Sequence, residues 1–187
     1  MNKSETIEWL AEAVGTATRS ANYCVSGLLK GVDPALEVDG LGAVAPPLNP
    51  KAAKRLVAAC KRAPYGKGTR TLVDKKVRNT FELDPKRFRL GDAWNAAVAE
   101  VARSVAKRLG LPADQLEARL YKLLVYEEGG FFLPHRDSEK HDGMVASLIV
   151  ALPNPFDGGT LVVRHGAVEQ ELRFEEAARG KAACYAA

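Results

Sequence analysis

The sequence has few cysteines and histidines, and it has no long apolar run. Three cysteines, Cys24, Cys60 and Cys184, are spread over 187 residues. Their odd number and wide spacing exclude a disulfide framework and a Cys-x-x-Cys metal site. No segment approaches the roughly 20 consecutive apolar residues that a membrane-spanning helix needs. The start, Met1 to Glu5, holds one lysine and leads into an amphipathic pattern rather than the apolar segment of a secretory signal. These absences predict a cytoplasmic protein with no membrane partner.

The basic residues are concentrated in one part of the chain. The whole sequence has 27 Lys/Arg and 23 Asp/Glu, but residues 51–89 alone hold 13 of the former and three of the latter. Such clustering occurs in proteins that bind anionic partners such as nucleic acid. It also occurs on a solvated helix face followed by a lysine-protected edge strand. No aromatic stacking pattern accompanies the charge, so the second interpretation is favoured.

The apolar periodicity changes along the chain from helical to strand-like. Helices are predicted over residues 4–15, 49–62 and 92–109. Asp92 is the expected cap of the last helix, and Gly110 its stop. Strands are predicted near 119–126, 132–137, 144–152, 159–165 and 167–174. Two main helices beside a run of short strands predict an α+β fold whose sheet forms a sandwich or barrel. Residues 1–48 are expected to be an N-terminal helix and extended lead-in, and residues 49–187 one structural unit.

The stretch that indicates chemistry is His135-Arg136-Asp137, which falls in a predicted strand. Side chains at positions i and i+2 leave the same face of a strand, roughly 6.6 Å apart along it. Imidazole nitrogen and carboxylate oxygen both bind divalent metals at about 2.0–2.2 Å. Two histidines and one carboxylate on one face leave coordination positions open, which suits non-haem Fe(II). Absent other signals, His135 is better explained as a turn histidine, with Asp137 capping the loop.

The residues around this pair form a wider pattern. It comprises Tyr126, Gly129-Gly130, the apolar strand 148–152 and Gly158-Gly159-Thr160-Leu161. The stretch from Tyr121 to His165 resembles the double-stranded β-helix core of prolyl-4-hydroxylase-type iron(II)/2-oxoglutarate dioxygenases. A looser similarity extends through residues 65–68 and 71–74. The resemblance implies a jelly-roll core with two main supporting helices, incomplete at the C-terminus.

The resemblance also implies roles for individual residues. His135 and Asp137 would be the first two iron ligands, and Tyr126 would lie near the co-substrate 2-oxoglutarate. Phe132 departs from the family, where many members have a tyrosine three residues before the ligand histidine. A phenyl ring cannot donate the hydrogen bond that the tyrosine would make.

The family's third ligand has no counterpart by position in this sequence. A distal histidine, followed by a Lys or Arg that pairs with 2-oxoglutarate, is expected in a region that begins just past Ala187. Two histidines are surrogate candidates. His141 lies four residues after Asp137 and is otherwise a surface-loop histidine. His165 shares a strand face with Leu161 and is otherwise a half-buried core or pocket histidine.

Three functions follow as expectations. The first is an Fe(II)/2-oxoglutarate-dependent oxygenase, or a truncated form of one, with a peptidyl residue as the first expected substrate. The second is a catalytically inactive interaction module on the same fold, which would associate with itself or a partner through an open sheet edge. The third, and least favoured, is nucleic-acid binding through residues 51–89, which would weaken steeply with salt.

Overall fold

The computed structural model describes residues 24–137, 139–140, 142–179 and 183–187. The helix predicted over residues 4–15 and the candidate ligand His141 lie outside these ranges. The chain divides into two compact units, described separately below. The described residues of the first unit fall within 24–34, 91–118 and 144–187, and those of the second within 35–90 and 119–143. The predicted division into residues 1–48 and 49–187 stays a prediction.

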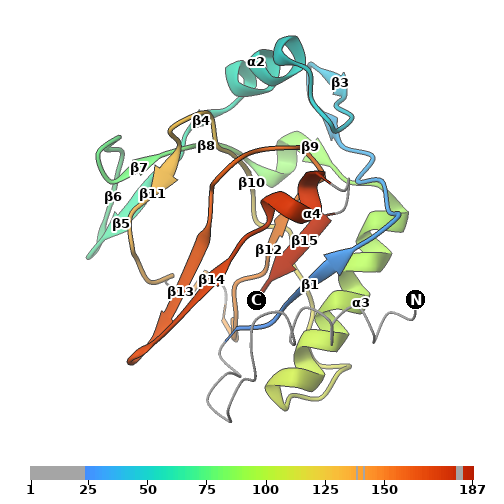
Figure 1. Cartoon of the computed structure of the whole chain (residues 1–187), viewed down its shortest axis with the longest axis vertical. Helices are drawn as coiled ribbons and strands as arrows, with labels where there is room; N and C mark the ends of the chain where they lie inside the picture. The colour runs from blue at the N-terminus through green and yellow to red at the C-terminus, as the bar shows by residue number, and fades with distance from the viewer. Residues whose placement is uncertain (1–23, 138, 141, 180–182) are drawn as a thin grey trace. The chain divides into compact units, whose positions relative to one another are not determined.

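The first unit contains a three-stranded antiparallel sheet, a β-hairpin and two helices (Figure 1). Its elements are β1 (Ser26–Leu29), α3 (Asp92–Leu109), β12 (Ile149–Ala151), β13 (Leu161–His165), β14 (Val168–Leu172), α4 (Glu175–Arg179) and β15 (Ala183–Ala186). Buried side chains of the hairpin and the sheet form one apolar cluster. The cluster contains Cys24, Leu172, Phe174 and Ala186, with Ala151, Phe156, Leu161 and Val163 packed against it.

The C-terminal strand β15 is the central strand of the sheet. It pairs antiparallel with β1 on one side and with β12 on the other, and Cys184 is opposite both Leu28 and Ala151. The backbone of Ala187 continues the pairing through two hydrogen bonds with Val25, of 2.7 and 2.8 Å. In the sheet as described, the edges are therefore β1 and β12, and the open edge expected from an incomplete jelly roll does not lie along β15.

Helix α3 forms where the apolar stripe of the sequence predicted it. Trp94, Val101, Ala102, Val105 and Ala106 are its buried residues, and this spacing keeps them on one face. Gly110 ends the helix in the left-handed conformation, with φ of 74°, which glycine adopts without steric penalty. The predicted cap was wrong by one position, because the N-cap is Gly91 and Asp92 lies in the first turn. There its carboxylate faces the positive end of the helix dipole.

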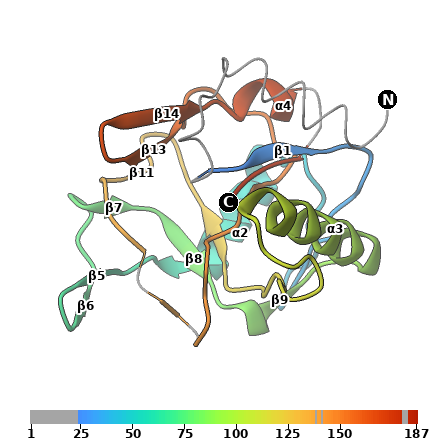
Figure 2. The same cartoon turned by 90° about the horizontal axis from the view of Figure 1, so that it is seen from below.

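The second unit consists of small sheets and one α-helix (Figure 2). Its elements are β2 (Glu37–Val38), β3 (Gly42–Ala43), α2 (Pro50–Ala59), β4 (Lys61–Arg62), β5 (Tyr65–Lys67), β6 (Arg70–Leu72), β7 (Arg78–Asn79), β8 (Phe81–Leu83), η1 (Pro85–Arg87), β9 (Phe88–Arg89), β10 (Leu123–Val125) and β11 (Phe131–Phe132). The sheets have the orders β10-β8-β4, β3-β2-β9, β11-β7 and β5-β6, and all pairings are antiparallel.

Helix α2 begins as predicted and ends early. The Asn49 side chain accepts a hydrogen bond from Ala52 N at 2.9 Å, and Pro50 occupies the first turn. The helix was predicted to run to about Arg62 but ends at Ala59. Lys61 and Arg62 are extended instead, because they pair with β8. Pairing with a strand outside the helix has therefore overridden the local helical pattern.

The α+β fold class is confirmed, whereas the jelly-roll core stays a prediction. The described strands form six sheets of two or three strands, and none of these sheets closes into a barrel. The hairpin predicted over 159–165 and 167–174 is present as β13 and β14. The strands predicted at 132–137 and 144–152 are much shorter, since only 131–132 and 149–151 are paired. No helix within the described ranges is long and apolar enough to cross a membrane.

Candidate functional site

The turn that leads to the His135 segment requires both glycines of its Gly pair. Gly129 has a φ of +69°. A Cβ at Gly130 would lie 2.8 Å from the Glu127 carbonyl oxygen and 3.2 Å from that of Asn79. The Asn79 side chain donates to the Gly129 carbonyl at 3.2 Å. The pair thus lets the chain turn tightly against β7, which aligns β11 with it.

Beyond β11 the chain leaves the sheet. Phe131 and Phe132 pair with Asn79 and Arg78, and Leu133 N donates to Val77 O at 3.0 Å. Pro134 follows, and its missing N–H together with its fixed φ ends the pairing. His135 and Asp137 are consequently in irregular backbone. The prediction that they share a strand face was wrong, and the proximity of their side chains has a different origin.

The two candidate ligands nevertheless converge. His135 Nε2 lies 3.7 Å from Asp137 Oδ1, and His135 Nδ1 lies 2.9 Å from the Leu133 carbonyl oxygen. A carbonyl only accepts, so Nδ1 carries the proton in that hydrogen bond. In the neutral form of such a ring, Nε2 has the lone pair, and this nitrogen is on the side of the carboxylate. Metal-binding histidines adopt the same arrangement, with the other ring nitrogen bonded to a carbonyl or carboxylate.

The separation of the two donor atoms is compatible with one shared ion. Bonds of about 2.1 Å place two donors roughly 3.0 Å apart at a right angle and roughly 4.2 Å apart when opposite. The 3.7 Å between Nε2 and Oδ1 falls between these limits. The same distance also suits a plain ion pair if His135 is protonated. In the described part of the chain, no group of three or more His, Cys, Asp or Glu is arranged to hold a metal.

The third ligand is therefore not supplied by the described residues around this pair. His141 is outside the described ranges. His165 ends β13 in the first unit, opposite Val168, and is exposed. The structure thus brings His135 and Asp137 together. It does not show whether His141 or His165 lies beside them.

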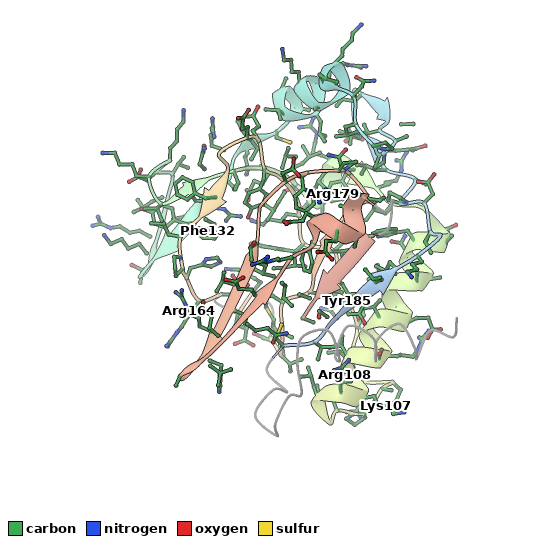
Figure 3. All side chains as sticks on the ribbon, viewed as in Figure 1. Lys107, Arg108, Phe132, Arg164, Arg179 and Tyr185 are labelled. Carbon is green, nitrogen blue, oxygen red and sulfur yellow. The ribbon has the colours of Figure 1, made fainter. Side chains whose placement is uncertain are left out.

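Phe132 supports the His135 ring. Their ring centroids are 3.6 Å apart, with 20° between the planes. Cζ of Arg78 lies 4.3 Å from the centroid of the same phenyl ring. Figure 3 labels Phe132 on β11. The residue that departs from the family pattern thus links His135 to Arg78, and stacking rather than a hydrogen bond restrains the imidazole.

Arg78 is a residue that sequence reasoning missed. Arg78, Thr80 and Glu82 are all buried, with 8%, 0% and 7% exposure. Arg78 Nε donates to Thr80 Oγ1 at 3.0 Å, and its Nη1 donates to the Pro64 carbonyl at 2.7 Å. Charged residues at alternate positions normally indicate the solvent face of a strand. One feature of the sequence could have indicated that these residues are buried. The polar residues continue over three alternate positions, with a threonine at the middle one.

Tyr126, the predicted co-substrate residue, belongs to the same neighbourhood. Half of the residue is exposed, with a relative exposure of 51%. Desolvation raises the pKa of the Tyr126 hydroxyl, and the positive charge of Arg78 opposes that rise. The hydroxyl therefore stays protonated at neutral pH and can donate a hydrogen bond. The positive charge of Arg78 acts on it. Tyr126, Phe132, His135, Asp137 and Arg78 all belong to the second unit.

Comparisons of the chain with protein-family models, curated proteins and solved structures find no match. A functional assignment consequently depends on the side chains themselves.

Proposed function

We propose that the chain is an iron(II)/2-oxoglutarate-dependent oxygenase of the prolyl-4-hydroxylase type that its sequence resembles. The observation that carries the proposal is the 3.7 Å approach of His135 Nε2 to Asp137 Oδ1. The hydrogen bond with the Leu133 carbonyl adds support, because in the neutral ring it places the proton on Nδ1 and makes Nε2 the nitrogen that can bind a metal. The proposal includes a jelly-roll core, which is the fold of this type of oxygenase.

In this proposal His135 and Asp137 hold Fe(II), and 2-oxoglutarate lies beside Tyr126. Bound iron supplies the oxidation of a C–H bond by O₂, with 2-oxoglutarate converted to succinate and CO₂. The chain's own residues orient the ligands: Phe132 restrains the His135 ring, and the Leu133 carbonyl holds the proton on Nδ1. The side chains of the pair are 42% and 51% exposed, so a bulky substrate such as a peptidyl side chain has access.

In this proposal the third ligand is either absent from this sequence or supplied by one of the two surrogate candidates. His141 and His165 are the two remaining histidines of the sequence. Separate His141→Ala and His165→Ala variants identify the contributor, because only the true ligand lowers the affinity for a divalent metal when it is removed. If neither variant lowers that affinity, the chain binds metal through His135 and Asp137 alone.

Anaerobic titration tests the function directly. The purified chain with Fe(II) and 2-oxoglutarate is expected to develop a visible charge-transfer band and, on admission of O₂, to release succinate. His135→Ala and Asp137→Ala should abolish both signals, while Asp142→Ala, a change at a nearby exposed carboxylate, should retain them. A folded wild-type chain that shows neither band nor succinate refutes the proposal.

The alternative is a catalytically inactive interaction module on the dioxygenase fold. The observation that favours it is the lack, in the described residues, of a third donor near His135 and Asp137. Such a module would bind itself or a peptide along an exposed sheet edge. Light scattering after size exclusion distinguishes the two: an iron-loaded monomer supports the oxygenase, and a metal-free dimer supports the module.

A further inference from the structure

The hairpin of β5 and β6 is a two-stranded ribbon, and among the described strands it pairs with no third one. Tyr65 is partly buried, and every residue from 66 to 72 is exposed. Figure 2 shows the ribbon extending away from β8. A two-stranded ribbon that buries little surface is only marginally stable in water. Its side chains are therefore available to another molecule.

The register of this hairpin places two cations directly opposite each other. Lys67 pairs with Arg70 across a two-residue turn in which Gly68 has a φ of 59°. Directly opposite side chains project from the same face, and like charges in such a pair are destabilising. Protection of a sheet edge requires a charge on the outer strand, not cations facing each other on two strands. The pair is thus unfavourable for the hairpin by itself.

Two other strand pairs of the chain have opposite charges in the equivalent arrangement. Arg164 is opposite Glu169 in the β13–β14 hairpin, and the two side chains form an ion pair. Arg89 is opposite Glu37 where β9 pairs with β2, and their closest atoms are 2.8 Å apart. Among the described residues, no carboxylate lies at ion-pair distance from either cation of the β5–β6 hairpin. The comparison indicates that their counter-charge comes from another molecule.

Further cations follow the hairpin directly. Residues 65–76, named the basic segment, contain four Lys/Arg and one acidic residue, Asp74. Asp74 Oδ1 accepts a hydrogen bond from Lys76 N at 2.8 Å, so this carboxylate is used within its own turn. Lys75 and Lys76 are exposed, and within the described ranges neither has an ion-pair partner. The basic segment thus suits a partner with several negative charges in a row.

One face of the hairpin combines these charges with apolar surface. Tyr65 lies opposite Leu72. Both share the face of Lys67 and Arg70, because alternate residues of a strand project to the same side. Leu72 is 36% exposed, and Val73 after it is 60% exposed. This grouping was missed in the sequence, since Tyr65 and Leu72 are seven positions apart and meet only across the turn.

The combination of charge and ring distinguishes between polyanions. An acidic peptide neutralises cations but has no row of planar rings to offer. A nucleic-acid duplex presents phosphates, while its bases are stacked on one another inside. A single strand presents both phosphates and unstacked bases. Proteins bind such strands with cations that follow the backbone and aromatic rings on which bases stack.

We infer that the basic segment binds single-stranded nucleic acid, with its four cations on phosphates and Tyr65 stacked on a base. The inference goes beyond the proposed oxygenase, because it uses neither His135 nor Asp137. It is therefore tested with metal removed, and its failure leaves the oxygenase proposal as it stands.

Fluorescence anisotropy in EDTA, with a labelled oligothymidylate of about 15 nucleotides, tests the inference on the wild-type chain. Four phosphate contacts at about −0.7 each give an expected slope of about −2.8 for log affinity against log salt. Poly-L-glutamate and a duplex of the same length should bind at least fivefold more weakly. Equal or tighter binding of either competitor, salt-independent binding, or no binding of the oligonucleotide overturns the inference.

Arg70→Glu separates binding from folding. The change places a carboxylate opposite Lys67, as in the Arg164–Glu169 pair, so the melting temperature should not fall below that of wild type. The affinity for the oligonucleotide should fall at least tenfold. Lys30→Glu is the control, because it makes the same change in charge at an exposed position of the first unit, and it should leave the affinity within twofold. Equal losses for the two variants contradict a site on the hairpin.

Tyr65→Leu tests the stacking. The variant keeps an apolar contact for Leu72 and all four cations of the basic segment. Its affinity should fall at least fivefold, because a stacked base is lost, while the salt slope should stay that of wild type. An unchanged affinity would show that the contact is electrostatic alone, and the assignment to a single strand would then be wrong.

Discussion

Tyr185 lies directly opposite Gly27 where β15 pairs with β1, and its ring occupies the space that a side chain at Gly27 would fill. A Cβ at Gly27 would come within 2.5 Å of the tyrosine hydroxyl oxygen. Tyr185 is 1% exposed, so the ring has little freedom to move away. Figure 3 labels Tyr185 on β15. The pair places a large aromatic ring over a strand glycine, an arrangement that fixes strand register.

Gly27→Ala is therefore expected to destabilise the protein by about 2 kcal/mol, because overpacking of a filled core forces side chains or backbone to shift. Gly66→Ala is the control, since a Cβ there meets nothing within 4 Å. It also lies in a strand, β5, where alanine is no worse than glycine. Urea denaturation measures both variants. Equal unfolding free energies for the two variants would show that the Tyr185 ring can move away from a side chain at position 27.

Tyr185 also predicts a loss of stability in alkali. Burial raises the pKa of its hydroxyl, while the charge of Arg108 acts in the opposite direction. A raised pKa means that the folded state holds the proton more tightly than the unfolded state. The resulting stabilisation is complete below the ordinary tyrosine pKa of about 10 and is lost as the pH rises through the folded value.

The measurement is the unfolding free energy between neutral pH and the alkaline range. Tyr185→Phe should flatten its decline above about pH 10, because the variant has no proton to lose at this position. Tyr65→Phe is the comparison, since Tyr65 is only partly buried in the β5 strand. If Tyr185→Phe and wild type lose stability in parallel, another group causes the decline.

The two lysines around Glu82 are predicted to contribute unequally. Lys122 is 19% exposed and lies 2.6 Å from the buried carboxylate, whereas Lys61 is 70% exposed and lies 3.5 Å from it. Lys122→Met should cost about 3 kcal/mol, because it leaves a buried charge without its close partner. Lys61→Met should cost less than about 1 kcal/mol, as exposed ion pairs do.

Thermal and urea denaturation of both methionine variants test this difference. Adding Glu82→Gln to Lys122→Met should recover much of the lost stability, because the buried charge is then removed together with its partner. Similar losses for the two lysine variants would place the carboxylate in a more solvated environment than its 8% exposure indicates.

Local patterns predicted the parts of the fold that local forces determine. Helix α3 was predictable because an apolar stripe and Gly110 act over adjacent turns. The hairpin of β13 and β14 was predictable because Gly166, with a φ of 59°, closes a two-residue turn between alternating strands. Both features depend on residues close together in the chain.

The features that were missed depend on distant residues or on a single backbone restriction. No local signal places β15 between β1 and β12, since β1 comes from the opposite end of the chain. Pro134 ends the strand that His135 and Asp137 were expected to share, yet the irregular backbone still brings their side chains together. Arg78 appeared solvent-exposed because its compensating contacts, Pro64 and Phe132, are remote in sequence.

The stacking of Phe132 on His135 gives a final prediction, which concerns the metal. Phe132 contacts the imidazole face to face and is not itself a ligand. Replacing it with leucine removes the planar contact and lets the ring turn away from Asp137. Loss of a residue that orients a metal ligand typically lowers affinity about 10- to 100-fold. Phe132→Leu should therefore weaken Ni²⁺ binding at least tenfold in calorimetry. Phe131→Leu changes the exposed neighbour in the same strand and should leave the affinity nearly unchanged. Equal affinities for the two variants would mean that His135 is oriented by the Leu133 carbonyl alone.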